Sequence, residues 1–295
     1  MPEYSLASSL FLYNKDGDNI GDPIEAIQSI SAAGFTQTEL MAEGIDWING
    51  PPDPKPILNA LESNQVFPHS IHAPYTDVNL ASLDENERQI GIEKVTAAIR
   101  FLGEVGGTTI IVHPTMSSAN INTPLYTLQN VGRATEAAHR SISKLISVAE
   151  VEGVRIALEN LPAKNMTVRP LETMKELRAF MSDLSPDFVG ICHDIGHSRL
   201  NKLDIADEAR IASDRLYALH IQDGFTQEDD HLPPGHGTLD FESYGKALKE
   251  IQFDGAWTLE VLSKNHPGTL EDITLELSGI KTIWTDNGMT NLNIT

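Results

Sequence analysis

The sequence has little cysteine, few basic side chains and no long apolar run. Cys192 is its only cysteine, which excludes an internal disulfide and a zinc site built from several cysteines. No stretch approaches the ~20 consecutive apolar residues of a transmembrane helix. The first residues have neither the basic segment nor the apolar segment of a secretory signal, so we expect a cytoplasmic protein.

Positive charge is scarce: the sequence has 21 Lys and Arg residues and 42 Asp and Glu residues, which gives a formal net charge of −21. A surface that binds nucleic acid is normally basic, because phosphate contacts dominate its affinity. We therefore expect a small-molecule substrate as partner, and neither nucleic acid nor a membrane. The excess carboxylates form a solvated acidic surface, or some of them bind metal ions that offset their charge.

The 295 residues, 40% of them hydrophobic, are enough for one barrel-type domain or for two small domains. β-branched and apolar runs alternate with helical patterns along the whole chain, and no linker divides it. The predicted strands are Tyr4–Phe11, Thr36–Leu40, His69–Ala73, Thr109–His113, Arg155–Asn160, Val189–Asp194, Leu216–Gln222 and Trp257–Leu262.

Helical segments lie between these strands and carry end signals, such as Asp22-Pro23 at a start and Gly34 after an end. The other predicted helices are Glu85–Val105, Gly132–Glu152, Pro170–Met181, Phe241–Ile251 and Leu270–Asp286. Eight strands alternating with helices predict a single-domain (β/α)8 TIM barrel over residues 1–295. A doubly wound sheet is the alternative, but the first strand–helix turn has no glycine-rich phosphate-binding sequence.

Ionisable side chains occur at the ends of seven of the eight predicted strands. They are Glu39, His72, His113, Glu159, Asp194, His220 and Glu260. The carboxyl ends of barrel strands meet at one rim, where the active sites of such barrels lie. A buried ionisable group costs several kcal/mol unless it is paired or bound to metal, so seven at one rim indicate a functional site.

The residue types indicate which metal ions fit. Glu159, Asp194, His220 and Glu260 follow four consecutive strands and form an oxygen-rich set that suits Mn²⁺, Co²⁺ or Mg²⁺ and permits Zn²⁺. A second set is richer in nitrogen and can hold a second metal or bind substrate oxygens. It comprises His72, His113, His197, Asp229 and His231.

Several motifs, in order from the second strand to the eighth, resemble the xylose isomerase-like TIM barrel superfamily, and specifically its sugar phosphate isomerase/epimerase branch. They are Glu39 in Thr-Glu-Leu, Ser70-Ile-His-Ala-Pro-Tyr75, Ile111-Val-His-Pro114, Leu158-Glu-Asn160, Asp194-Ile-Gly-His197, Leu219-His-Ile-Gln-Asp223, His231-Leu-Pro-Pro-Gly-His-Gly237 and Leu259-Glu260. The set is specific to the superfamily, which also includes dehydratases and endonuclease IV, and not to one reaction.

The resemblance implies a divalent-metal-dependent isomerase or epimerase of a sugar, or of a sugar-like polyol or keto acid. In the ketose epimerases of this family, one ion is held by the residues that match Glu159, Asp194, His220 and Glu260, and His197 matches a substrate contact. The metal stabilises an enediolate. Glu159 and Glu260 form the acid/base pair that removes and returns the proton. Relatives are often homo-oligomers.

One departure from the ketose epimerases supports an alternative reaction. Those enzymes usually have an arginine shortly after the histidine that matches His220, and here the sequence continues Ile-Gln-Asp-Gly-Phe-Thr. All nine ligand positions of the three-zinc endonuclease IV site also have counterparts, including the Asp229-x-His231 spacing. The alternative is a metal-dependent hydrolase or lyase that activates water on a small anionic substrate. A non-catalytic binding protein ranks last, because both glutamates are present.

Further residues are predicted at the substrate pocket. Glu39, Trp47, Asn160 and His236 are expected to line it or to orient its groups, and Glu43 and Asp46 lie close to Trp47 in the sequence. Lys164 and Arg169, after the fifth strand, are the nearest cations for a substrate phosphate or carboxylate.

Overall fold

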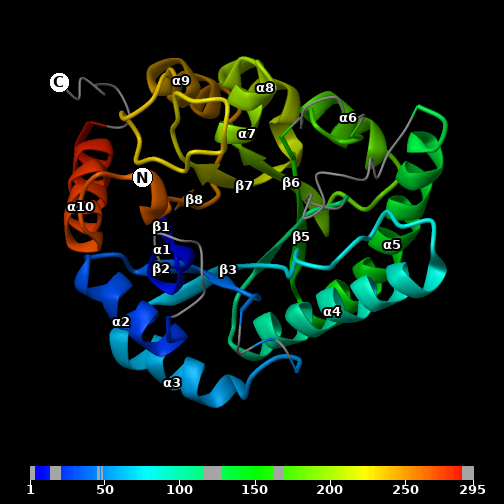
Figure 1. Ribbon diagram of the computed structural model, residues 1–295, viewed down its shortest axis with the longest axis horizontal. Coiled ribbons are helices and arrows are strands. Elements are labelled where there is room, and N and C mark those ends of the chain that lie inside the picture. The colour runs from blue at the N-terminus through cyan, green and yellow to red at the C-terminus, as the bar shows by residue number, and fades with distance from the viewer. Residues whose placement is uncertain are drawn as a thin grey trace.

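Eight parallel strands pair in chain order, and β8 pairs with β1 to close a barrel in this computed structural model (Figure 1). The structure describes residues 4–13, 21–44, 47, 49–115, 128–162 and 169–287. The strands are β1 (Tyr4–Ala7), β2 (Gln37–Met41), β3 (Phe67–His72), β4 (Thr109–Val112), β5 (Arg155–Glu159), β6 (Val189–Asp194), β7 (Leu216–Ile221) and β8 (Trp257–Leu259). The predicted (β/α)8 architecture is confirmed.

Helices surround the strands (Figure 1). They are α1 (Ser9–Leu12), α2 (Pro23–Ala32), α3 (Pro54–Asn64), α4 (Glu85–Glu104), α5 (Val131–Glu152), α6 (Met174–Phe180), α7 (Ile195–Leu200), α8 (Ile205–Ala212), α9 (Phe241–Glu250) and α10 (Leu270–Asn287), with the 3₁₀ turns η2 (Ser213–Arg215) and η3 (Ser263–Asn265). Within the described residues, none of these helices combines the length and the apolarity that a membrane crossing requires.

Aspartate caps followed by proline begin two of the helices. Asp22 accepts a hydrogen bond from the backbone N–H of Ile24 at 2.7 Å, and Asp53 accepts one from Lys55 at 3.1 Å. An aspartate at the N-cap satisfies a free N–H of the first turn, and a proline at the next position has the φ angle that a helix needs. The same signal therefore marks α2, which the sequence analysis predicts, and α3, which it misses.

Three predicted boundaries are wrong by three or four residues. The eighth strand ends at Leu259 and not at Leu262. The first strand ends at Ala7 and not at Phe11, because the carbonyl of Ser8 accepts hydrogen bonds from Phe11 and Leu12 and starts the helical turn of α1. A short apolar run does not distinguish a strand from a buried helix. Helix α6 begins at Met174 and not at Pro170: Leu171 has a left-handed φ of 68°, and Thr173 caps the helix.

The strand alternation places small and apolar side chains inside the barrel, below the titratable ones. Ile111, Ala157, Cys192 and Ala218 form a buried interior cluster together with Tyr217. Each of the first four lies two residues before a predicted site residue, and side chains two apart on a strand share a face. Apolar side chains therefore fill the barrel interior, and the predicted site residues lie next to them, closer to the carboxyl ends of the strands.

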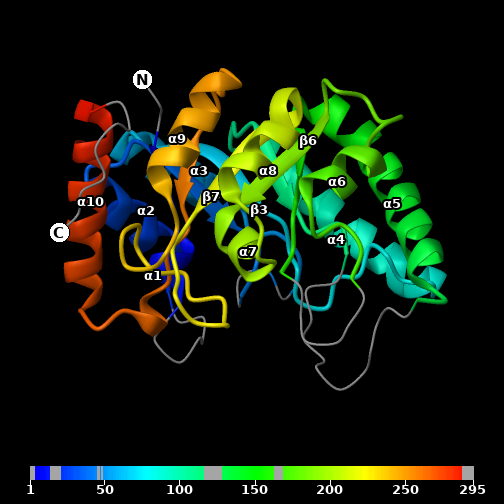
Figure 2. The ribbon, with the colours of Figure 1, turned by 90° about the horizontal axis from the view of Figure 1, so that it is seen from above.

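The long connection after β7, residues 223–240, is anchored by one carboxylate. The carboxylate of Asp223 accepts four backbone hydrogen bonds, from Gly224 at 2.8 Å, Gly235 at 3.0 Å, Gly237 at 2.9 Å and Leu239 at 3.3 Å. In Figure 2 this connection, in yellow, extends below the barrel. A segment with this many backbone bonds to one buried side chain can hold functional groups in a fixed position.

Candidate active site

Nine predicted site residues come together at the carboxyl ends of the strands. Asp194 of β6 lies beside His220 of β7 in the strand register, and the connection after β7 adds two further residues. Most of the nine are buried; His113 and Asp229 are partly exposed. The group, which we call the mouth cluster, comprises His72, His113, Glu159, Asp194, His197, His220, Asp229, His231 and Glu260.

Glu159 lies among three imidazoles. Its Oε2 is 3.1 Å from His113 Nε2 and 3.3 Å from His72 Nε2, and its Oε1 is 3.2 Å from His197 Nδ1. Burial would raise the pKa of Glu159, but the imidazoles of His113 and His220 outweigh it and hold the pKa well below the ordinary value. Glu159 is therefore an ionised carboxylate in the barrel mouth.

His220 lies among three carboxylates. Its Nδ1 is 3.1 Å from Glu260 Oε2, 3.7 Å from Glu159 Oε2 and 4.0 Å from Asp194 Oδ2. Ligand atoms that share a metal ion at about 2.1 Å lie about 3 to 4 Å from one another. Apart from their own 3.1 Å contact, His220 Nδ1 and Glu260 Oε2 have no hydrogen-bond partner within the described part of the chain. The four residues therefore fit a divalent ion, and their role as its ligands stays a prediction.

Hydrogen bonds to backbone carbonyls fix the tautomers of three histidines. A carbonyl only accepts, so the Nδ1 atoms of His72, His197 and His231 must carry protons. Their acceptors are the carbonyls of Ala73 at 2.8 Å, Asn160 at 2.8 Å and Glu260 at 3.1 Å. Each Nε2 then faces a carboxylate of the mouth cluster. Burial would lower the pKa of His197 and His231, but the neighbouring carboxylates outweigh it and raise that pKa, so each of these Nε2 atoms carries a proton toward Asp229 here and would release it on binding an ion. Metal-binding histidines keep the same outer hydrogen bond to a carbonyl.

His220 has the same arrangement with its nitrogens exchanged. Its Nε2 lies 3.3 Å from Glu39 Oε2, and a carboxylate only accepts, so Nε2 carries the proton. This leaves Nδ1 for a metal. Glu39 also accepts a hydrogen bond from Ser70 Oγ at 2.7 Å. The sequence analysis predicts Glu39 as a residue of the substrate pocket. In the structure it lies on the opposite side of the His220 ring from the other three carboxylates and orients that ring.

The pKa values of two further carboxylates in the cluster are shifted in opposite directions. Burial would raise the pKa of Glu260, but the imidazoles of His220 and His231 outweigh it and lower that pKa to about 2. Burial raises the pKa of Asp194 to about 7, although the imidazole of His197 opposes the change. Asp194 therefore benefits most from an additional cation nearby.

Two residues at the site were missed by the sequence analysis. Gln222 donates hydrogen bonds to the carboxylate of Asp194, at 3.0 and 3.2 Å. It follows His220 by two residues, so strand alternation alone could have placed it on the same face. The ring of Tyr75 lies 5.2 Å from that of His72 and 5.4 Å from that of His113, but no local spacing predicts these contacts.

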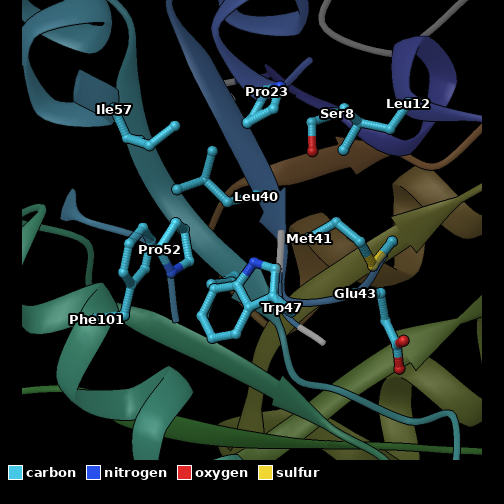
Figure 3. A pocket seen from close by; sticks show the side chains of 11 residues that line it. Ser8, Leu12, Pro23, Leu40, Met41, Glu43, Trp47, Pro52, Ile57 and Phe101 are labelled. Carbon is cyan, nitrogen blue, oxygen red and sulfur yellow. The ribbon is translucent and has the colours of Figure 1, made fainter. Parts of the chain in front are cut away.

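An apolar pocket is lined by Trp47 and residues of β2, α1, α3 and α4. Figure 3 shows Trp47 near the centre of the lining, with Leu40, Met41 and Pro52 around it. The ring of Trp47 packs edge-on against that of Phe101, with the centroids 5.1 Å apart. Trp47 therefore lines a pocket whose described lining includes none of the mouth-cluster residues, and its predicted place in a substrate pocket stays a prediction.

The remaining predicted residues have other surroundings. Asn160 holds the backbone of Asp194: it accepts from the N–H of Asp194 at 2.8 Å and donates to its carbonyl at 3.0 Å. Arg169 is buried and donates to the carbonyl of Pro162 at 2.8 Å. Asp46 and Lys164 lie outside the described residues.

His236 belongs to a separate group. Its Nε2 contacts Glu276 of α10, which also accepts from His266 Nε2 at 3.1 Å. We call His236, His266 and Glu276 the outer triad; their ligand-type atoms lie within 4.8 Å of one another. The ring contact of His236 is likewise with His266, at 5.4 Å between centroids.

Comparison with known proteins identifies relatives of this chain. Residues 27–278 match the family described as xylose isomerase-like TIM barrel. An uncharacterized protein of Methanocaldococcus jannaschii is 26% identical over 239 residues, 80% of this chain and 78% of that protein. The D-psicose 3-epimerase of Enterocloster bolteae is 30% identical over 136 residues, 46% of this chain and 43% of that enzyme. The fold resembles the crystal structure of a D-tagatose 3-epimerase-like protein, with a TM-score of 0.78, 22% identity and coverage of 99% of this chain and 100% of that chain.

Proposed function

This chain belongs to the xylose isomerase-like TIM barrel family, and on that basis we propose that it is a metal-dependent isomerase or epimerase of a sugar or of a sugar-like polyol or keto acid. Glu159, Asp194, His220 and Glu260 would hold the ion, with Mn²⁺, Co²⁺ or Mg²⁺ favoured and Zn²⁺ permitted. The observation that carries the proposal is the position of His220 Nδ1 within 4.0 Å of three carboxylates, with the opposite ring nitrogen held by Glu39. The epimerase among its relatives supports the same class of reaction.

A bound divalent ion supplies Lewis-acid stabilisation of the negative charge that develops on substrate oxygens. The chain itself supplies the proton transfers. One of the two glutamates, Glu159 or Glu260, takes the proton from the carbon next to the carbonyl. The other delivers a proton to the opposite face for epimerisation, or to the adjacent carbon for isomerisation. The low pKa of each keeps an ionised acceptor ready near neutral pH. The glutamate that delivers a proton must therefore first take one up from solvent.

A second candidate is a hydrolase or lyase with several metal ions. His197 Nε2 and His231 Nε2 both lie close to Asp229 Oδ2, at 3.2 and 3.0 Å. The outer nitrogen of each ring donates to a carbonyl. These three residues of the second ligand set are not needed for one ion, and they favour a site that activates water on a small anionic substrate.

The direct test is exchange of a substrate proton with solvent deuterium. Ketoses and inososes are incubated in D₂O with the Mn²⁺-loaded protein, and exchange next to the carbonyl is followed by NMR. Glu260→Gln and Glu159→Gln should each slow exchange by about 10²- to 10⁴-fold, because each removes a proton carrier.

The matched control is Glu276→Gln, since Glu276 also lies between two histidines but in the outer triad. It should leave the exchange rate unchanged. Exchange that survives both mouth substitutions would refute the assigned acid/base pair. Absence of exchange with every substrate, together with metal-dependent hydrolysis of small phosphate esters, would favour the second candidate.

A further inference from the structure

Gln222 lies directly after β7 and is fully buried, and its carboxamide connects two parts of the mouth cluster. Its Nε2 lies 3.0 and 3.2 Å from the two oxygens of Asp194 and 3.3 Å from Asp229 Oδ1. Its Oε1 accepts a hydrogen bond from the backbone N–H of His231 at 3.1 Å. One side chain therefore contacts a ligand of the barrel wall and both candidate ligands of the 223–240 connection.

A carboxamide offers both kinds of group that this set of contacts needs. Two carboxylates need donors, and the N–H of His231 needs an acceptor. An ionised glutamate in place of Gln222 would offer acceptors only, and a lysine would offer donors only. The neighbouring backbone is also shaped for this group: a Cβ added at Gly196 would lie 2.3 Å from Gln222 Cδ. The amide is thus enclosed as well as hydrogen bonded.

The contact on Asp229 has a consequence for the other oxygen of that carboxylate. Since Oδ1 is held by Gln222, Oδ2 faces His197 and His231. The backbone of His231 has a left-handed φ of 47°, which is unusual for a residue other than glycine. The hydrogen bond from its N–H to Gln222 helps to hold that conformation.

We propose that Gln222 is a positioning residue: it holds Asp194, a ligand of the proposed ion, in place by tying its carboxylate to Asp229 and His231 of the 223–240 connection. The proposal rests on the metal site of the proposed function, but it does not depend on which reaction the site performs. Loss of a positioning contact behind metal ligands typically lowers metal affinity by about 10- to 100-fold.

The test compares Gln222→Met with Asn201→Leu. Methionine keeps the length of glutamine and removes both polar groups. Asn201 is a matched control, because its amide donates to the carbonyls of Leu161 and Glu172. Two quantities are measured for each variant: Mn²⁺ affinity by calorimetry, and amide hydrogen exchange of the 223–240 connection in the metal-free protein.

We expect Gln222→Met to weaken Mn²⁺ binding by about 10- to 100-fold and to speed exchange in the connection, while Asn201→Leu changes neither. Wild-type affinity in Gln222→Met, or an equal loss in Asn201→Leu, would overturn the proposal and leave the proposed function standing. If the wild type binds no Mn²⁺, the proposed function fails. In that case the amide hydrogen exchange of the 223–240 connection alone tests the role of Gln222. Unchanged exchange in Gln222→Met refutes that role, and faster exchange in that variant but not in Asn201→Leu supports it.

Discussion

The mouth cluster and the outer triad contain the same kinds of ligand, but their hydrogen bonds have opposite directions. In the mouth cluster, Nδ1 of His72 donates to a carbonyl and Nε2 faces Glu159. In the outer triad, Nδ1 of His266 accepts from the N–H of Gly268 at 2.9 Å, so its proton is on Nε2 and is donated to Glu276. A metal at that Nε2 would force the proton onto Nδ1, where it would face another N–H.

The two regions also differ in burial. The side chain of His220 is 0% exposed, whereas that of His236 is 37% exposed; His266 of the outer triad is 7% exposed, like His197 of the mouth cluster at 8%. An unpaired ionisable group costs much more in the interior than at the surface. Close approach of histidine and glutamate is therefore not enough to indicate a metal site. The hydrogen bond of the opposite ring nitrogen distinguishes the two cases, and the central histidine of the mouth cluster, His220, is fully buried.

The largest expected effect is the difference in Mn²⁺ affinity between His220→Ala and His266→Ala. Alanine at 220 removes the nitrogen among three carboxylates, and we expect Mn²⁺ affinity to fall by more than about 100-fold. Alanine at 266 should leave Mn²⁺ affinity unchanged. Calorimetric titration of the metal-free variants measures both. A loss of Mn²⁺ affinity in His266→Ala would show that the outer triad binds metal, and it would contradict the distinction between the two regions.

A smaller effect is expected for Glu39→Gln. Glutamine still offers an acceptor to His220 Nε2 but lacks the charge that makes the ring a stronger ligand, so Mn²⁺ affinity should fall about 10-fold. The same titration measures it, and the melting temperature of the metal-free variant serves as control. Unchanged affinity with a normal melting temperature would mean that Glu39 does not orient the ligand.

The smallest effect is expected for Glu276→Gln. The partly exposed pairs of Glu276 with His236 and His266 should contribute about 1 kcal/mol or less to the free energy of unfolding. Urea titration measures that change, and metal content and activity should equal those of the wild type. A loss of several kcal/mol would show that the outer triad holds the fold together.

The strands and the ligands they carry were predictable because their signals are local. Alternation along β6 and β7 placed Asp194 and His220 on the inner face, and the register confirms that they are neighbours. The same alternation would have identified Gln222. The contact between His236 and Glu276, 40 residues apart, has no local signal. The histidine tautomers could not be predicted either, because they depend on which carbonyl or carboxylate each ring contacts in the folded chain.

The most direct test of the metal site is the metal content of the wild-type protein, purified without added metal and measured by elemental analysis beside Glu260→Gln. The account predicts about one equivalent of Mn²⁺, Co²⁺ or Mg²⁺ per chain in the wild type and its loss in the variant. Two or three equivalents of Zn²⁺ would contradict the single-metal isomerase and favour the hydrolase or lyase. Absence of any metal, even after loading with these ions, would contradict the central claim.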